Sequence, residues 1–190
     1  MDGSEASRAG LLRRLAIRGH LPGDVDPLLD ELIIQGCALS VGDSVILTEA
    51  GTRAAQQDLL LGEQDPRRAS LKARMPHFDV LDQRVREVCT AWQLLPDGTP
   101  NTHDAGYDET IGRRLADVHH DALELIVHLG NIDPHLDEYA ELLSVACDAF
   151  LAGDTTMLAS PVRASYHTVW MWLHQELRLL LGLPPGDDPR

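Results

Sequence analysis

The segment Ser165 to Leu183 (SYHTVWMWLHQELRLLLGL) constrains the fold most, because as a helix it leaves little surface for water. It lacks proline, and Gly182 near its end is its one glycine. At helical spacing one stripe carries two histidines, a tryptophan and a leucine: His167, Trp170, His174 and Leu177. Further apolar residues widen the same side: Val169, Leu173 and Leu180. Such a helix must lie deep among other elements, and its histidines are buried with it.

The composition limits the classes of protein to which the chain can belong. With 190 residues it is long enough for one or two domains. Its net charge of −14 opposes binding to nucleic acid or anionic membranes unless arginines gather locally. No long apolar run and no charged-then-apolar leader occurs, so we expect neither a membrane span nor a signal peptide. Three cysteines in helix-like settings indicate reduced thiols in a cytoplasmic protein: Cys37, Cys89 and Cys147.

The first sixty residues predict alternating helices and short strands. A helix with a basic outer face is expected over 7–18, ended by Gly19. After a break at 21–23, Asp24 or Asp26 can cap a second helix. The turn signal Gly42-Asp43 predicts a hairpin. The expected elements are a helix over 27–36, strands over 38–41 and 44–47, and a helix over 48–61.

This order of elements resembles the winged-helix domain of MarR-like regulators. The residues that carry the resemblance are Arg18-Gly19, LLDELIIQG at 28–36 and LTEAG at 47–51. The resemblance implies a winged-helix fold, DNA binding and a homodimer, since MarR-like proteins are usually dimers.

The sequence departs from that family where DNA would be read. The segment between Gly19 and the next helix leaves room for a turn at most in place of a full second helix. The helix in the recognition position carries acidic residues and no basic one: Asp24, Asp26, Asp30 and Glu31. Carboxylates there repel phosphate, so DNA binding is disfavoured. The arginines that could still contact DNA lie on the first helix: Arg8, Arg13, Arg14 and Arg18.

The second half of the chain predicts an antiparallel four-helix bundle. A polar linker over 62–70 separates it from the winged-helix-like domain at 1–61. The bundle occupies 71–183, and the tail at 184–190 is expected to be disordered. Its helices are expected over 76–95, 108–130, 134–152 and 165–183, with a long polar loop over 96–106. The predicted fold class is therefore mainly α, with one small β-hairpin.

This half resembles a helical module of actinobacterial proteins, which in some cases follows domains of phosphoenolpyruvate-utilising, dikinase-like enzymes. The matching residues are AWQL at 91–94, PNTHDAGYD at 100–108, AGDT at 152–155 and SYHTVW with LH at 165–174. The resemblance implies a regulatory or docking role. Dikinase activity does not carry over, because the chain contains no matching catalytic domain.

A pocket is predicted at the mouth of the bundle. The polar loop brings His103, Asp104, Tyr107 and Asp108 after a helix that ends near Trp92. In an up-and-down bundle the last helix could reach the same end. The candidate ligand-binding residues are Trp92, His103, Asp104, Tyr107, Tyr166, His167, Trp170 and His174. Such a pocket suits a cationic or polyhydroxylated small molecule, whereas the plainer reading is that Asp104 or Asp108 only caps a helix.

Neither a metal site nor a catalytic group is predicted. His167 and His174 lie two turns apart on one face, but metal-binding bundles use paired Glu-x-x-His motifs, and the chain has none. The plainer reading is that both are hydrogen-bonded core residues. No serine sits in a nucleophile-elbow sequence and no glycine-rich loop would hold phosphate, so we expect no cofactor.

Three functions remain open at this point. The first, which the acidic recognition helix and the aromatic bundle favour, is a non-enzymatic regulatory module that binds a partner protein or a small-molecule effector. The second is a MarR-like transcriptional regulator that contacts DNA through the arginines of its first helix. The third is a small enzyme using the loop at 103–107 with tryptophan walls.

Trp170 and Trp172 point about 200° apart on one helix, so one of them could face a second protomer, and a homodimer is expected.

Overall fold

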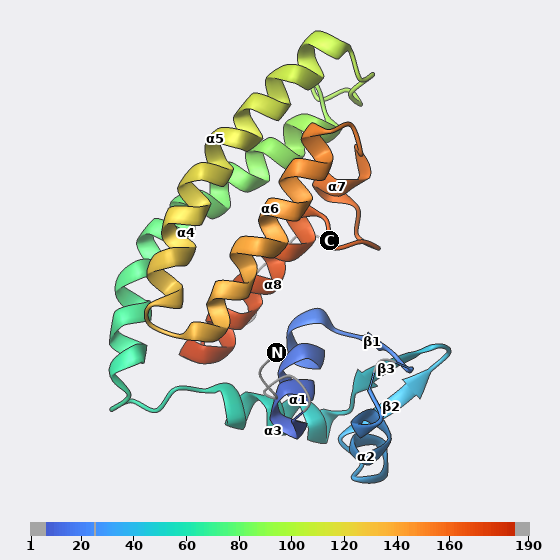
Figure 1. Cartoon of the computed structure of the whole chain (residues 1–190), viewed down its shortest axis with the longest axis vertical. Helices are drawn as coiled ribbons and strands as arrows, with labels where there is room; N and C mark the ends of the chain where they lie inside the picture. Colours follow the sequence, from blue (N-terminus) through green and yellow to red (C-terminus); the bar gives the residue numbers. More distant parts are fainter. Residues whose placement is uncertain (1–6, 25, 185–190) are drawn as a thin grey trace. The chain divides into compact units, whose positions relative to one another are not determined.

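Helices form most of the computed structural model, which describes residues 7–24 and 26–184 (Figure 1). The described residues form eight α-helices, one short 3-10 helix and a three-stranded antiparallel sheet, so the mainly α class is confirmed. The chain divides into two compact units. The N-terminal unit takes in the described residues up to Gln64 and those from His174 onward, and the helical unit is Asp65–Leu173.

The N-terminal unit begins with α1 (Arg8–Arg18), whose ends are set by local hydrogen bonds. The side chain of Ser7 accepts from the N–H of Gly10 at 3.1 Å. At the other end Gly19 adopts a φ of 80°, and its N–H donates to the carbonyl of Leu15 at 2.9 Å. The leucines of one face of α1 are buried in the core of this unit: Leu11, Leu12 and Leu15.

The sheet packs its buried residues into the same core. Its strands are β1 (Leu21–Pro22), β2 (Ala38–Val41) and β3 (Ser44–Leu47), in the order β1-β3-β2. The β2–β3 hairpin turns at Gly42-Asp43 as the sequence predicts. The strand β1 was not predicted, because its two residues pair with Ser44 and Val45 far along the chain and leave no local pattern.

Two further helices complete the part of the N-terminal unit that precedes Gln64. In α2 (Leu28–Ile34), Leu29 and Leu32 face the core, and Asp26 accepts from the N–H of Leu28 at 3.0 Å. In α3 (Glu49–Leu59), the N-cap Thr48 accepts from the N–H of Gly51 at 3.1 Å. A Cβ atom on Gly51 would lie 1.8 Å from the carbonyl oxygen of Cys37, so no larger residue fits there.

The helix α8 spans Tyr166–Leu181, and its second half, from His174 onward, also belongs to the N-terminal unit. Glu176, which is 1% exposed, accepts two hydrogen bonds from the guanidinium of Arg13, at 2.6 and 2.8 Å. The N–H of Leu61 donates to the carbonyl of Leu180 at 3.0 Å. This half of α8 is thus tied to the segments that build the rest of the unit.

The helical unit consists of long helices that run up and down alongside one another (Figure 1) and of two helices of four residues each. They are α4 (Pro66–Gln93), α5 (Ala105–Gly130), the 3-10 helix η1 (Pro134–Asp137), α6 (Glu138–Leu151), α7 (Thr156–Ala159) and the first half of α8. The long helix α5 packs against both α4 and α6. At the core, the ring of Phe78 stacks on Trp170 with centroids 5.1 Å apart, and the indole N–H of Trp170 donates to Asp82 at 2.9 Å.

Several boundaries differ from the sequence predictions. The helix α4 starts at Pro66, ahead of the predicted start at 76 and inside the linker expected over 62–70, because Asp65 caps the helix and Pro66 occupies its first turn. The helix continues through Pro76. Because proline has no N–H, the carbonyl of Lys72 lacks its helical hydrogen bond, but Lys72 is exposed and water can hydrate this carbonyl. The helix α5 starts at Ala105, ahead of the predicted start at Asp108, since Asp104 caps it.

Part of the segment between α6 and α8 is helical, which the sequence did not predict: α7 spans Thr156–Ala159. The residues 185–190 of the expected disordered tail lie outside the described residues. Within the described part of the chain, no helix combines the length and the apolar character needed to cross a membrane.

Candidate functional site

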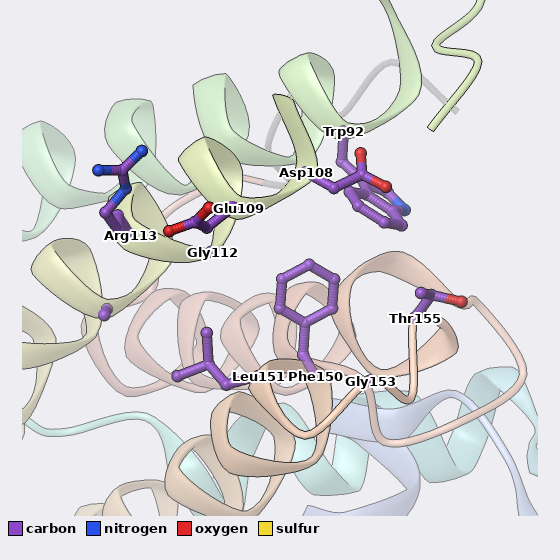
Figure 2. A pocket seen from close by; sticks show the side chains of 10 residues that line it. Trp92, Asp108, Glu109, Gly112, Arg113, Phe150, Leu151, Gly153 and Thr155 are labelled. Carbon is purple, nitrogen blue, oxygen red and sulfur yellow. The ribbon is translucent and has the colours of Figure 1, made fainter. Parts of the chain in front are cut away.

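A pocket of about 370 Å³ opens at one end of the helical unit (Figure 2). One wall is a single face of α5, where residues at helical spacing line the space. The opposite wall comes from the end of α6 and the turn that follows it, and Trp92 from the end of α4 closes one side. The residues lining the pocket are Trp92, Asp108, Glu109, Gly112, Arg113, Ala116, Phe150, Leu151, Gly153 and Thr155.

Small residues on α5 make room for the pocket. Gly112 is buried, and a Cβ atom there would lie 3.2 Å from the side chain of Leu151. Ala116, one turn further along, is half-buried and also lines the space. Larger side chains at these two positions would fill the gap between α5 and the end of α6.

Trp92 forms the aromatic wall of the pocket together with Phe150. The two rings meet edge to face, with centroids 5.0 Å apart and planes at 86°. The imidazole of His103 also contacts Trp92, at a centroid distance of 4.5 Å. The indole is therefore held by neighbours from two other segments, and its orientation is fixed before any ligand binds.

The loop that follows α4 is an ordered turn built around Asn101. Leu94 and Pro100 form an antiparallel bridge, which reverses the chain. Asn101 is buried, and its side-chain amide donates to the carbonyl of Trp92 at 3.0 Å and to Asp108 at 3.2 Å. Its side-chain oxygen accepts from the N–H of His103 at 2.9 Å. One buried amide thus ties the end of α4, the loop and the first turn of α5 together.

The carboxylate of Asp108 is held at the rim of the pocket by two neighbours. One oxygen accepts from Asn101, and the other lies 3.4 Å from Nδ1 of His103. Asp104 accepts from the N–H groups of Gly106 and Tyr107 and so caps α5, as the plainer reading predicted. His103, Asp104 and the half-buried Tyr107 lie next to the pocket but do not line it.

The predicted site residues on α8 do not join this group. The hydroxyl of Tyr166 lies 3.4 Å from Nδ1 of His119, in the middle of α5, and Trp170 packs on Phe78 in the core. His167 is half-buried and His174 is buried. The helix α8 therefore starts beside the middle of α5, after a segment that contains α7 and its flanking turns. Among the predicted ligand-binding residues, Trp92 alone lines the pocket.

A second polar cluster lies inside the helical unit, around His119. Its Nε2 is 3.4 Å from the hydroxyl of Ser144, and its Nδ1 is 3.4 Å from that of Tyr166. Burial lowers the pKa of His119 and raises that of Tyr166. Burial also raises the pKa of Cys89 to about 12 and that of Cys147 to about 11, so these thiols are unreactive near neutral pH.

The arginines of α1 are engaged within the N-terminal unit. Arg13 binds Glu176, as described above, and only 14% of its side chain is exposed. Arg14 lies 3.5 Å from Asp26, and Arg8 donates to Gln35 at 3.1 Å. Arg18 is half-buried in the last turn of α1. Most of the arginines predicted as possible DNA contacts are therefore paired with groups of the protein itself.

The residues that sequence reasoning missed come from three segments. Glu109, Gly112 and Arg113 follow Asp108 at helical spacing, so the helix prediction over 108–130 contained a signal for them. Asn101 stands in the quoted motif PNTHDAGYD, but only its burial identifies its role. Phe150 carries no local signal, because it reaches Trp92 only through the packing of the helices.

Among the described residues, no group of three or more histidine, cysteine, aspartate or glutamate side chains is arranged to hold a metal ion. No protein-family model, curated protein or solved structure matches the chain.

Proposed function

We propose that the chain is a non-enzymatic regulatory protein whose helical unit binds a small-molecule effector in the pocket beside Trp92. The observation that carries this proposal is the pocket itself. Its volume of about 370 Å³ falls within the range of ordinary ligand sites. Its walls combine two aromatic rings with a small number of charged groups, which is the usual composition of a binding site for a small molecule.

The regulatory role is supported by the order of elements in the N-terminal unit. A helix, a short strand, a second helix, a hairpin and a third helix follow one another, as in the winged-helix domain that the sequence resembles. The close approach of Gly51 to Cys37 gives the LTEAG motif a physical reason, since only glycine fits where α3 meets the residue before β2. We therefore assign this unit to the winged-helix type.

Reading of DNA by this unit is the less favoured alternative. The first turn of α2 carries the exposed Asp30 and Glu31, which repel phosphate. Arg13 and Arg14 are already paired with carboxylates, so a phosphate contact would have to break an ion pair in the protein. A winged helix with this surface suits contact with protein better than contact with DNA.

An enzymatic role has weaker support. Asp104 caps α5 and His103 does not line the pocket, so the loop at 103–107 does not direct a catalytic pair into it. The contact between His103 and Asp108, at 3.4 Å, instead fixes the rim beside Trp92.

The proposal is tested by screening a fragment library against the protein with ligand-observed NMR. The variant Ala116→Met fills the pocket, because Ala116 is half-buried on its α5 wall and methionine is a good helix former. The control is Ala140→Met, which makes the same substitution at a half-buried residue of α6 outside the pocket. We expect fragments that bind the wild type and Ala140→Met but not Ala116→Met. A screen without hits, or with hits insensitive to Ala116→Met, would refute the proposal.

A further inference from the structure

We infer that the pocket beside Trp92 selects an organic cation, an ammonium group on a small apolar body. This inference rests on the proposed function and specifies the ligand class of the same site. The sequence alone leaves cationic and polyhydroxylated ligands open, and the geometry of the pocket decides between them.

The aromatic wall supplies a surface that attracts cations. The faces of tryptophan and phenylalanine rings carry negative charge, and tryptophan is the strongest such partner. Phe150 meets Trp92 edge to face at 5.0 Å, so the ring of Phe150 is fixed against the indole. A trimethylammonium or similar group presents only apolar contacts around its charge, which matches a wall made of rings, Leu151 and the small residues of α5.

The rim adds carboxylates on the same side. Asp108 is held by Asn101 and His103 and lies beside the indole of Trp92 (Figure 2). Glu109 also lines the pocket, and its side chain is exposed to an approaching ligand. Figure 2 shows the guanidinium of Arg113 turned away from Phe150 and Trp92. A cation on the aromatic wall would therefore meet carboxylates before it met the arginine.

The balance of charge at this end of α5 is negative. The N-terminus of a helix carries the equivalent of about half a positive charge, and Arg113 adds one. Against these stand three carboxylates in the cap and the first turns: Asp104, Asp108 and Glu109. Even a protonated His103 would leave the balance about half a charge negative. The overall charge of −14 also attracts an approaching cation.

A polyhydroxylated ligand fits this pocket less well. Sugars and polyols need several hydrogen-bonding groups within the walls, in addition to an aromatic face. Here four of the lining residues have no polar side-chain group: Phe150, Leu151, Gly112 and Ala116. Asp108 lies beside Trp92, whereas the guanidinium of Arg113 is turned away from the rings (Figure 2), which suits a ligand with one cationic end.

The test compares choline with its carbon analogue, in which a tert-butyl group replaces the trimethylammonium group. Heteronuclear NMR at low salt follows the indole N–H of Trp92 and the amide of Gly112. We expect both signals to shift with choline, and choline to bind about tenfold more tightly than the neutral analogue. Glu109→Gln and Asp108→Asn should each weaken choline binding severalfold and leave the analogue unaffected. Asp117→Asn, an exposed residue of α5 outside the pocket, removes the same charge and should change neither.

Equal affinities for choline and the analogue would overturn the inference, and so would the absence of choline-induced shifts at millimolar concentrations. A preference for xylitol or acetate at the same signals would overturn it too, in favour of a polyol or an anion. In these cases the proposed function stands if fragments still bind in a manner sensitive to Ala116→Met. If no fragment does so, the proposed function fails as well.

Discussion

At the scale of single residues, Gly51 shows how closely α3 approaches Cys37, the residue just before β2. A Cβ atom at this position would lie 1.8 Å from the carbonyl oxygen of Cys37, which is backbone and cannot move aside alone. The hydroxyl of Thr48, three residues earlier, links the same turn to the chain by donating to the carbonyl of Gly36 at 2.7 Å. The start of α3 therefore has one fixed position.

We predict that Gly51→Ala lowers the free energy of unfolding by about 2 kcal/mol or more, because the added methyl group forces the backbone apart. Urea unfolding measures the change. The control is Gly62→Ala, where the site is exposed and a Cβ atom meets nothing within 4 Å. Similar stability of the two variants would contradict the close approach.

His119 gives a prediction for pH at the same scale. Its pKa is lowered, mainly by burial, although Asp148 acts in the opposite direction. The folded protein thus favours the neutral ring, so the unfolded chain takes up the proton first as the pH falls below about 6.5. The free energy of unfolding should therefore decrease as the pH is lowered from about 7 to the lowered pKa of His119.

The measurement is urea unfolding at several pH values for the wild type, His119→Gln and His128→Gln. His119→Gln should show a shallower loss of stability over this range, whereas His128→Gln, which changes an exposed residue of α5, should keep the wild-type dependence. An unchanged dependence in His119→Gln would show that the ring is not held neutral.

At the scale of elements, α1 and the end of α8 are joined by a nearly buried ion pair. The guanidinium of Arg13 donates to both oxygens of Glu176, whose side chain is 2% exposed. Removing one partner leaves a buried charge, so Arg13→Met should cost about 3–5 kcal/mol of the free energy of unfolding. The double variant Arg13→Met/Glu176→Leu should recover most of that loss, because it replaces the pair by apolar groups.

A double-mutant cycle with these variants and Glu176→Leu measures the coupling. Additive effects of the two single changes would mean that the pair contributes nothing in solution. Arg13 would then be available to other partners, including DNA.

Local patterns predicted the elements that carry their own start and stop signals. The hairpin with its Gly42-Asp43 turn, the helix ended by Gly19 and the aromatic helix α8 were found in this way. The strand β1 and the role of Phe150 were not, because both depend on residues far away in the chain. At the candidate site, Trp92 could be found from its place before a polar loop. Tyr166 could not be excluded, since the length that α7 occupies before α8 was unknown.

At the scale of the whole molecule, the charge of −14 and the paired arginines of α1 disfavour DNA binding. The protein should not bind DNA even at low salt, and a binding affinity that falls steeply as salt is raised would contradict this.

We also propose a homodimer, so light scattering at tens of micromolar should give about twice the chain mass of 20.9 kDa. A species of 20.9 kDa would refute the dimer.

The central claim is that a small molecule binds between α5 and the end of α6, against Trp92. A crystal structure of the protein soaked with the fragment hits tests it most directly. The account predicts ligand density in contact with Trp92 and Phe150, with any charged nitrogen toward Asp108 and Glu109. Density at other surfaces only, or a pocket closed by the side chains of Leu151 and Arg113, would contradict it.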